Sequence, residues 1–350
     1  MNVTEQMRQV VVRGPGQVAV VSAVVPQPGP GDVRVRTSVV GVCGSDLHVL
    51  DGNHPFVTFP VLPGHEVAGI IDALGPDVSD FAPGQRVLVE PNLICGRCRY
   101  CQSGRYNLCE QLAVVGFQAP GSLADCFTVP ASRLHLIPDS MTDKEAALVE
   151  PLSTATHAVR VAGGDLGGRT VAILGAGSIG LFTLIAAREA GAAAIAVTDL
   201  QEGKRQRARR LGARAAIDAR DELGVEHIKE ALDGRPDVTF DCVSNQASID
   251  QAMALAQKGG TVVVVGVAAG PVQIPLPIIQ DHEIRIEGSA MYVRQDVQRA
   301  FALLQSGAVP IEEIVTATYP LEQIEHAYAA AQTGDHVKVQ IRVAGVERRT

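Results

Sequence analysis

A short apolar segment runs into a glycine-rich turn and then a helix at Val171-Ala172-Ile173-Leu174-Gly175-Ala176-Gly177-Ser178-Ile179-Gly180. The first glycine permits a tight turn, the second lets the backbone approach a pyrophosphate, and the third lets the helix pack closely on the strand. The positive end of the helix then faces the phosphate charge. Glycines also serve ordinary turns, but a turn in this context predicts a dinucleotide site, with contacts from Gly175, Gly177, Ser178, Ile179 and Gly180.

Asp199 is an acidic residue at the position where a dinucleotide-binding turn is followed by a carboxylate that contacts the ribose. It stands nineteen residues after Gly180, at the end of the next apolar segment, 194–198. A carboxylate at this position accepts hydrogen bonds from the adenosine ribose hydroxyls and repels a 2′-phosphate. This favours NAD over NADP, although Lys204 and Arg205 lie near enough in the sequence to compensate the extra charge of NADP.

The chain on the two sides of this turn follows different patterns. From about residue 168 onward, apolar segments of strand length alternate with helical patterns, which predicts a parallel sheet covered on both faces. Residues 9–151 instead contain short β-branched runs separated by Pro- and Gly-rich turns, which is typical of a compact antiparallel barrel or folded sheet. The tail is too short to fold alone and should return to the first domain. We therefore expect domains at 1–155 and 156–290, and a returning segment at 291–350.

Composition excludes several classes of protein. The chain has 350 residues, 46% of them apolar and 19% charged, which is too apolar for a disordered chain. The net charge of -8 and the lack of a basic block argue against nucleic-acid binding. The longest apolar runs have about nine residues, whereas a membrane helix needs roughly twenty. The start, Met1-Asn2-Val3-Thr4-Glu5-Gln6, lacks the pattern of a secretory signal. We expect a cytoplasmic protein without membrane or nucleic-acid partners.

Four of the seven cysteines lie within fifteen residues of one another, at Cys95, Cys98, Cys101 and Cys109. Four thiolates from one loop can wrap a tetrahedral zinc ion and leave no position for water, which predicts a structural zinc. An iron–sulfur cluster or reduced thiols are the alternatives, but the bacterial cluster motif has a shorter last gap followed by proline. Cys126 and Cys242 are interpreted as ordinary buried thiols.

A second set of metal-ligand residue types is dispersed along the chain, at Cys43, His65, Glu66 and Glu150. Each has an ordinary interpretation as a buried thiol, a core or surface histidine, or a solvated carboxylate. Together they form a mixed sulfur, nitrogen and oxygen set, which would leave zinc an open position for catalysis.

Several motifs appear together in one order: Gly41-Val42-Cys43-Gly44-Ser45-Asp46-Leu47-His48, Gly64-His65-Glu66-Val67-Ala68-Gly69, the four-cysteine loop, Glu150-Pro151-Leu152-Ser153 and the glycine turn. In this combination the chain resembles the zinc-dependent medium-chain alcohol dehydrogenases over essentially its whole length. Glu150 stands where part of that family has a zinc-binding cysteine, and this points to the sorbitol, butanediol and threonine dehydrogenase branch. The resemblance implies an α/β protein with a GroES-like β-rich catalytic domain, which carries a structural-zinc lobe at 95–109, and a Rossmann doubly wound parallel-sheet domain.

The resemblance also implies roles for individual residues. Cys43 and His65 are expected to bind the catalytic zinc, with Glu66 and Glu150 as alternating further ligands. Asp46 would orient the zinc-bound histidine. Ser45 and His48 would relay the alcohol proton to solvent. Thr154 and Lys204 would contact the nicotinamide and the ribose.

The expected activity is hydride transfer between a secondary alcohol or polyol and NAD, with two zinc ions per chain, one catalytic and one structural. Val49 and Met291 stand where polyol enzymes of this branch carry aromatic and arginine side chains, which favours a smaller, less polar alcohol or ketone. A homodimer or homotetramer is expected. The alternative is an inactive family member that serves as a dinucleotide-binding regulatory protein.

Overall fold

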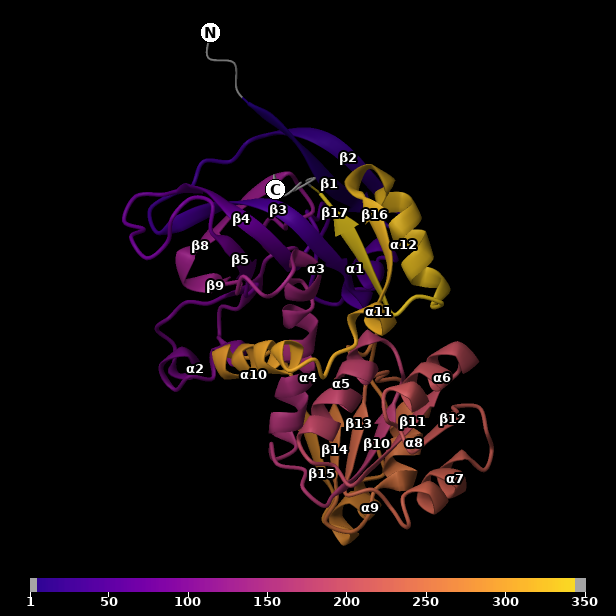
Figure 1. The fold of residues 1–350 in the computed structure, drawn as a ribbon. Coiled ribbons are helices and arrows are strands. Elements are labelled where there is room, and N and C mark those ends of the chain that lie inside the picture. The colour runs from indigo at the N-terminus through magenta and orange to yellow at the C-terminus, as the bar shows by residue number, and fades with distance from the viewer. Residues whose placement is uncertain (1–4, 344–350) are drawn as a thin grey trace. The chain divides into compact units, whose positions relative to one another are not determined.

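The computed structural model describes residues 5–343, which divide into two compact units (Figure 1). The first unit contains the chain up to Glu150 and again from Ile314, and the second contains Pro151–Glu313. Residues 1–4, on which part of the expectation about a secretory signal rests, lie outside the described residues. Among the helices that are described, none combines the length and the apolar character needed to traverse a lipid bilayer.

A seven-stranded sheet dominates the first unit, in the order β16-β17-β3-β4-β5-β9, with β8 also paired to β3. Most of its neighbours are antiparallel, whereas β16 and β17 are parallel. Its strands are β3 (Asp32–Val42), β4 (Glu66–Leu74), β5 (Arg86–Val89), β8 (Cys126–Pro130), β9 (Leu134–Leu136), β16 (Val315–Pro320) and β17 (Lys338–Arg342). The alternating valines of these strands form the apolar core, which confirms the predicted β-rich domain.

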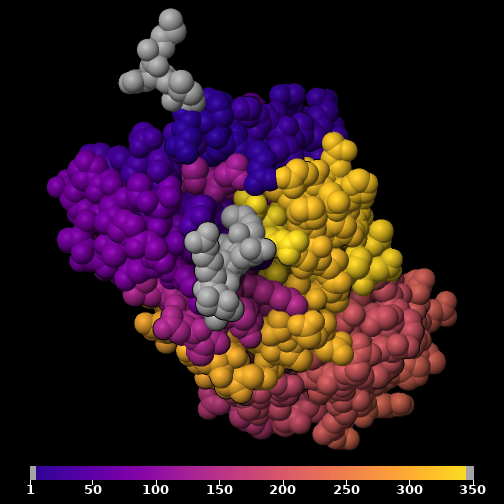
Figure 2. Space-filling model, turned by 45° about the horizontal axis from the view of Figure 1, so that its top comes forward, coloured from indigo at the N-terminus to yellow at the C-terminus, as the bar shows by residue number. Residues whose placement is uncertain are grey.

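Smaller elements complete the first unit. A hairpin joins β1 (Gln6–Gly14) to β2 (Gln17–Val24), and a short ladder joins β6 (Asn92–Leu93) to β7 (Ala113–Val114) at the base of the four-cysteine loop. The helix α12 covers β16, β17 and β2, so the carboxy-terminal segment lies against the amino-terminal strands (Figure 2). The helical segments are α1 (Gly44–Leu50), α2 (Arg99–Gln102), η1 (Tyr106–Leu108), η2 (Ala131–Arg133), α3 (Asp143–Ala146), η3 (Leu321–Gln323) and α12 (Ile324–Thr333).

The second unit is built on a six-stranded parallel sheet in the order β12-β11-β10-β13-β14-β15, with helices on both of its faces (Figure 1). This order reverses beside β10, as in a doubly wound dinucleotide-binding fold, and confirms the Rossmann prediction. The strands are β10 (Thr170–Leu174), β11 (Ala194–Asp199), β12 (Ala215–Asp218), β13 (Val238–Asp241), β14 (Thr261–Val264) and β15 (Arg285–Gly288). The helices are α4 (Val149–Val161), which begins at the end of the first unit, α5 (Ser178–Glu189), α6 (Glu202–Arg210), α7 (Gly224–Ala231), α8 (Gln246–Leu255), α9 (Leu276–Asp281), α10 (Arg294–Gln305) and α11 (Ile311–Ile314).

The returning segment begins later in the structure than residue 291. The helix α10 remains in the second unit because its buried Asp296 accepts hydrogen bonds from His157 and Arg160 of α4, at 2.9 and 2.7 Å. We therefore propose a domain boundary near Glu313 in place of the expected one.

Candidate metal and dinucleotide sites

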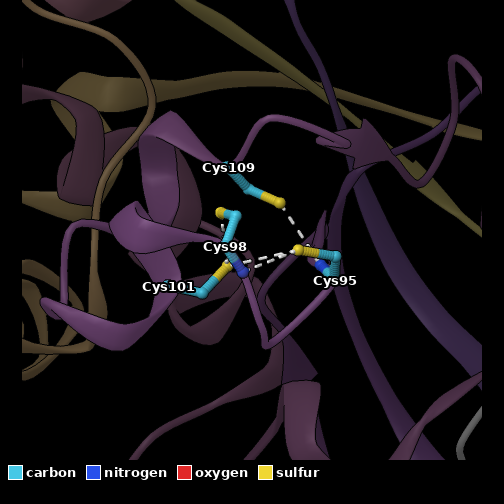
Figure 3. Close-up of side chains that lie close together, drawn as sticks. All are labelled: Cys95, Cys98, Cys101 and Cys109. Carbon is cyan, nitrogen blue, oxygen red and sulfur yellow. Dashed lines mark hydrogen bonds between the residues drawn. The ribbon is translucent and has the colours of Figure 1, made fainter.

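The four cysteines of the loop between β6 and β7 bring their sulfur atoms together (Figure 3). All four sulfurs lie within 4.8 Å of one another, with 3.5 Å between those of Cys98 and Cys101 and 4.0 Å between those of Cys95 and Cys101. Zinc–sulfur bonds of about 2.3 Å in a tetrahedron would hold the sulfurs roughly 3.8 Å apart. The loop is therefore already folded around a space of the size that zinc needs.

Backbone N–H groups prepare these sulfurs to act as thiolates. Hydrogen bonds from the N–H groups of Arg97 and Cys98 lower the pKa of Cys95, and those of Cys101 and Glu110 lower the pKa of Cys98 to about 6. Loss of solvent, together with side-chain hydrogen bonds to Cys98 and Cys109, raises the pKa of Cys101 to about 12. Four sulfur atoms of this kind could together hold a dication such as zinc.

A second cluster forms where β3 and β4 lie side by side. Cys43 follows the end of β3, and His65 and Glu66 stand at the start of β4. The β3–β4 ladder pairs Gly41 with Glu66, so residues more than twenty positions apart meet at one end of the sheet. Ligand atoms of Cys43, His65 and Glu66 lie within 4.8 Å of one another.

Asp46 and His65 form the buried side of this cluster. Oδ2 of Asp46 accepts a hydrogen bond of 2.9 Å from the backbone N–H of Cys43, and Oδ1 lies 3.7 Å from Nδ1 of His65. Oδ1 and Nδ1 are both buried and have no hydrogen-bond partner within residues 5–343. Burial disfavours an imidazolium, but the negative charges of Asp46, Cys43 and Glu150 outweigh it and raise the pKa of His65 well above its ordinary value. The cluster thus attracts positive charge, as a cation site must.

Glu150 is buried near the end of the first unit, as the second residue of α4. It acts electrostatically on His65 but is not one of the three residues whose ligand atoms lie within 4.8 Å. Thr154 follows one helical turn later and is half-buried.

Ser45 and His48 lie three residues apart on α1, so their side chains share one helix face. Ser45 is half-buried and His48 is exposed, so exposure to solvent increases from Ser45 to His48. Val49 is only 2% exposed and belongs to the apolar core. Its side chain therefore packs inside the first unit, which weakens the argument that its aliphatic character selects the substrate.

Three residues near the cluster were not found from the sequence. The ring of Phe117 lies 4.9 Å from that of His65, and the ring of His54 stacks on Phe117 at 4.8 Å. Lys338, from the last strand, contacts Glu66. A lone lysine in the strand pattern of 337–341 gives no signal of this contact, because 272 positions separate the two residues.

The glycine turn has the geometry that its sequence predicts. A Cβ atom at Gly180 would lie 1.8 Å from the carbonyl oxygen of Gly175, so only glycine lets α5 approach β10. Gly175 has a positive φ of 91°. A Cβ atom at Gly177 would meet nothing within 4 Å, so this side of the turn is open to a ligand. Ser178 and Ile179 begin α5 beside it.

Asp199 ends β11 and is hydrogen-bonded to the glycine turn. Its Oδ2 accepts from the N–H of Ala176 at 2.8 Å, and its Oδ1 accepts from the N–H of Gln201 at 2.9 Å. Arg205 is buried, pairs with Glu202 and Asp218, and donates to the carbonyl of Asp199. Arg205 is therefore already bound within the unit, whereas Lys204 is half-buried on the same helix.

Comparisons with known proteins cover nearly the whole chain. The model of the alcohol dehydrogenase GroES-like domain matches residues 29–139, and the model of the zinc-binding dehydrogenase matches residues 178–306. Sorbitol dehydrogenase of Gallus gallus is 34% identical over 98% of this chain and 98% of its own length.

Two solved structures are also similar. A proposed zinc-binding dehydrogenase from Sinorhizobium meliloti 1021, bound to NADP, is 35% identical with a TM-score of 0.89, over 97% of this chain and 99% of its own. The 2R,3R-butanediol dehydrogenase from Bacillus subtilis is 27% identical with a TM-score of 0.89, over 97% of this chain and 100% of its own.

Proposed function

Because the chain belongs to the zinc-dependent medium-chain alcohol dehydrogenase family, we propose that it transfers hydride between a secondary alcohol or polyol and NAD. The observation that carries this proposal is the cluster of Cys43, His65 and Glu66, whose ligand atoms lie within 4.8 Å of one another around a position that attracts positive charge. Family membership alone makes the chain an NAD(P)-dependent alcohol or polyol dehydrogenase.

We assign two zinc ions to each chain. Cys95, Cys98, Cys101 and Cys109 would hold a structural ion, since all four positions are filled by thiolates. Cys43 and His65 would hold the catalytic ion, with Glu66 or Glu150 completing the protein ligands. Zinc in the second site supplies Lewis-acid polarisation of the substrate oxygen.

The remaining steps depend on side chains of the first unit. Asp46 holds the start of α1 through the N–H of Cys43, and its second oxygen faces His65 to orient the ring. The hydroxyl of Ser45 would accept the proton of the substrate alcohol and pass its own proton toward His48, which would release it to solvent, as its exposed position on α1 suits.

We propose NAD as the preferred cofactor. The glycine turn would receive the pyrophosphate at the N-terminus of α5, and Asp199 and Lys204 would contact the ribose, with Thr154 beside the nicotinamide. A carboxylate at the ribose repels a 2′-phosphate, and Arg205 is already held by Glu202 and Asp218. The specificity constant kcat/KM should therefore be larger with NAD than with NADP. A larger value with NADP would overturn this preference.

The function is tested with purified protein, secondary alcohols and polyols, and the absorbance of reduced nicotinamide. Turnover should require Cys43 and His65, so Cys43→Ser should lose catalysis together with one zinc per chain, while the four-cysteine site keeps its own. Full turnover and full zinc content in this variant would contradict the assignment. If wild-type protein with both zinc and cofactor bound turns over no substrate, the non-catalytic alternative replaces the proposal.

Within this class we favour a small or weakly polar secondary alcohol, an argument that now rests on Met291, since Val49 is buried in the core. A cytoplasmic location and a homodimer or homotetramer complete the proposal. Reduced cysteines in two metal sites suit a reducing compartment.

A further inference from the structure

Three helices of the second unit, α4, α5 and α10, line a hollow of about 240 Å³ (Figure 1). Its most buried lining side chains are Thr156, Val159 and Ala186, none of them more than 5% exposed. Two arginines, Arg160 and Arg299, line the same hollow. Binding sites for small molecules combine apolar side chains with a few polar groups in this way, and the small volume selects a compact ligand.

Arg160 is held in a fixed position by Asp296. Its Nε donates to Oδ1 of Asp296 at 2.7 Å, and its Nη2 donates to Oδ2 at 3.0 Å. The carboxylate is only 2% exposed, whereas the arginine side chain is 38% exposed. Nη1 takes no part in this pair, so its two N–H groups can donate to a ligand from a guanidinium that is already oriented. A donor that is oriented in advance loses less conformational entropy when the ligand binds.

Arg299 adds a second positive charge to the hollow. It lies three residues after Asp296 on α10, so the two side chains share one face of the helix. Its Nη2 donates to the carbonyl oxygen of Glu189, the last residue of α5, at 3.2 Å, while the Glu189 carboxylate pairs with Arg188. Among the described residues that line the hollow, the carboxylate of Asp296 therefore offsets one of two guanidinium groups. The excess of positive charge favours an anionic ligand.

The hollow lies away from the glycine turn. Ala186 stands in the second half of α5, and Ala190 follows the end of that helix. Ser178, where the pyrophosphate is proposed to bind, is the first residue of the same helix. At a rise of 1.5 Å per residue, Ser178 and Ala186 are roughly 12 Å apart along the helix axis. A ligand in the hollow is therefore distinct from the dinucleotide.

We propose that this hollow binds a small organic carboxylate. Its carboxylate accepts hydrogen bonds from Arg160 and Arg299, since the planar guanidinium group matches the geometry of a carboxylate. Its short apolar body lies against Val159 and Ala186, which removes apolar surface of the ligand from water. The inference is independent of the proposed function, because none of these residues is assigned to zinc or to the dinucleotide.

Benzoate is the probe, and its binding to the full-length protein is measured by titration with ligand-observed NMR. It should bind with a Kd of about 1 mM, within the affinity that a ligand of this size can reach. Benzamide has the same ring without the charge, and inorganic phosphate has charge without an apolar body. Each should bind at least about tenfold more weakly, because one charge-assisted hydrogen bond or one buried apolar group accounts for that difference. Saturating NAD should leave the Kd of benzoate unchanged.

Two variants locate the bound benzoate. Arg299→Met removes one guanidinium and, with it, only a hydrogen bond to the carbonyl of Glu189, so the Kd of benzoate should rise by about tenfold while the fold is kept. Ala190→Leu keeps both arginines but fills part of the hollow and should weaken binding at least as much. Arg235→Met is the matched control, since this exposed arginine of the second unit also donates to a backbone carbonyl, that of Ala256, and does not line the hollow. Its Kd should equal that of wild-type protein.

The inference is overturned if benzoate and benzamide bind equally well, or if Arg299→Met and Ala190→Leu both keep the wild-type affinity. Competition between benzoate and NAD would place benzoate in the dinucleotide site and would also overturn it. Phosphate that binds as tightly as benzoate, and depends on Arg299, would show a site for inorganic anions in place of organic carboxylates. Circular dichroism of each variant confirms that a loss of binding is not a loss of fold.

Discussion

Asp46 is the residue on which two parts of the candidate site depend. One oxygen holds the backbone N–H of Cys43 at 2.9 Å and the other lies 3.7 Å from Nδ1 of His65. The separation from His65 is too long for a hydrogen bond, although both atoms are buried and neither has a hydrogen-bond partner in the described part of the chain. A small movement of the imidazole on metal binding would close it. The resemblance implies that Asp46 orients the histidine, and the geometry is suited both to this role and to bracing the turn at Cys43.

Asp46→Asn should therefore weaken the catalytic zinc while leaving the four-cysteine zinc in place. The amide oxygen of Asn can still accept the hydrogen bond from the backbone N–H of Cys43. It carries no negative charge to orient the imidazole of His65, so zinc affinity at the catalytic site should fall by about 10- to 100-fold. Competition with a chromogenic chelator, followed by metal analysis, measures the two sites separately. Equal affinities in the variant and in wild-type protein would show that Asp46 only braces the turn.

At the scale of elements, the strand–turn–helix of β10 and α5 offers a matched pair of glycines. In Gly180→Ala the new Cβ would lie 1.8 Å from the carbonyl oxygen of Gly175, so the helix must move and stability should fall by about 1–3 kcal/mol. In Gly177→Ala the new Cβ would meet no atom within 4 Å, so the stability of the fold should not change. The added methyl group would instead occupy the space of the pyrophosphate and lower the affinity for NAD. Thermal unfolding and NAD titration measure the two effects. Undiminished NAD affinity in Gly177→Ala would remove the turn from the binding site.

Asp296 of α10 forms ionic contacts with His157 and Arg160 of α4. Burial alone would raise the pKa of Asp296, but hydrogen bonds from His157 and Arg160 outweigh it and lower the pKa to about 2. A carboxyl group with a depressed pKa in the folded state stabilises the protein fully above its unfolded pKa of about 3.9, and this contribution disappears as the pH falls through the folded pKa. The shift corresponds to about 2 kcal/mol at neutral pH.

Asp296→Asn should lower the free energy of unfolding at pH 7 by about 2 kcal/mol, and the difference from wild-type protein should shrink to about half by pH 3. Urea unfolding followed by circular dichroism at several pH values measures this difference. A difference that stays constant with pH would mean that the carboxylate is not charged in the way that its contacts imply.

Local pattern predicted most elements of the second unit, because buried parallel strands are continuous apolar runs and Gly175, Gly177 and Gly180 have steric roles that only glycine fills. It missed β15, whose residues Arg285–Gly288 are all exposed and form no apolar run. In the site, the motifs predicted Cys43 and His65, but the contact of Lys338 with Glu66 depends on the pairing of β17 with β3. Pairing between strands so far apart in the sequence depends on the whole sheet, so a short stretch of sequence cannot predict it.

At the scale of the whole molecule, β15 is an edge strand that pairs with β14 and with no other strand of residues 5–343. Its four residues are exposed, among them the apolar Ile286, which is 37% exposed. Unpaired N–H and C=O groups next to exposed apolar side chains form a surface on which a second chain can pair. If the chain forms the expected homodimer or homotetramer, we predict that it associates through this edge.

Ile286→Lys tests this interface because a charge at a sheet edge opposes pairing while leaving the contacts with β14 intact. Light scattering coupled to size exclusion should give a dimer or tetramer for wild-type protein and a smaller species for the variant. Leu223→Lys is the control, since Leu223 is an exposed apolar residue away from β15 and its replacement should leave the mass unchanged. A monomeric wild-type protein would contradict the expected assembly. An unchanged mass in Ile286→Lys would move the interface away from β15.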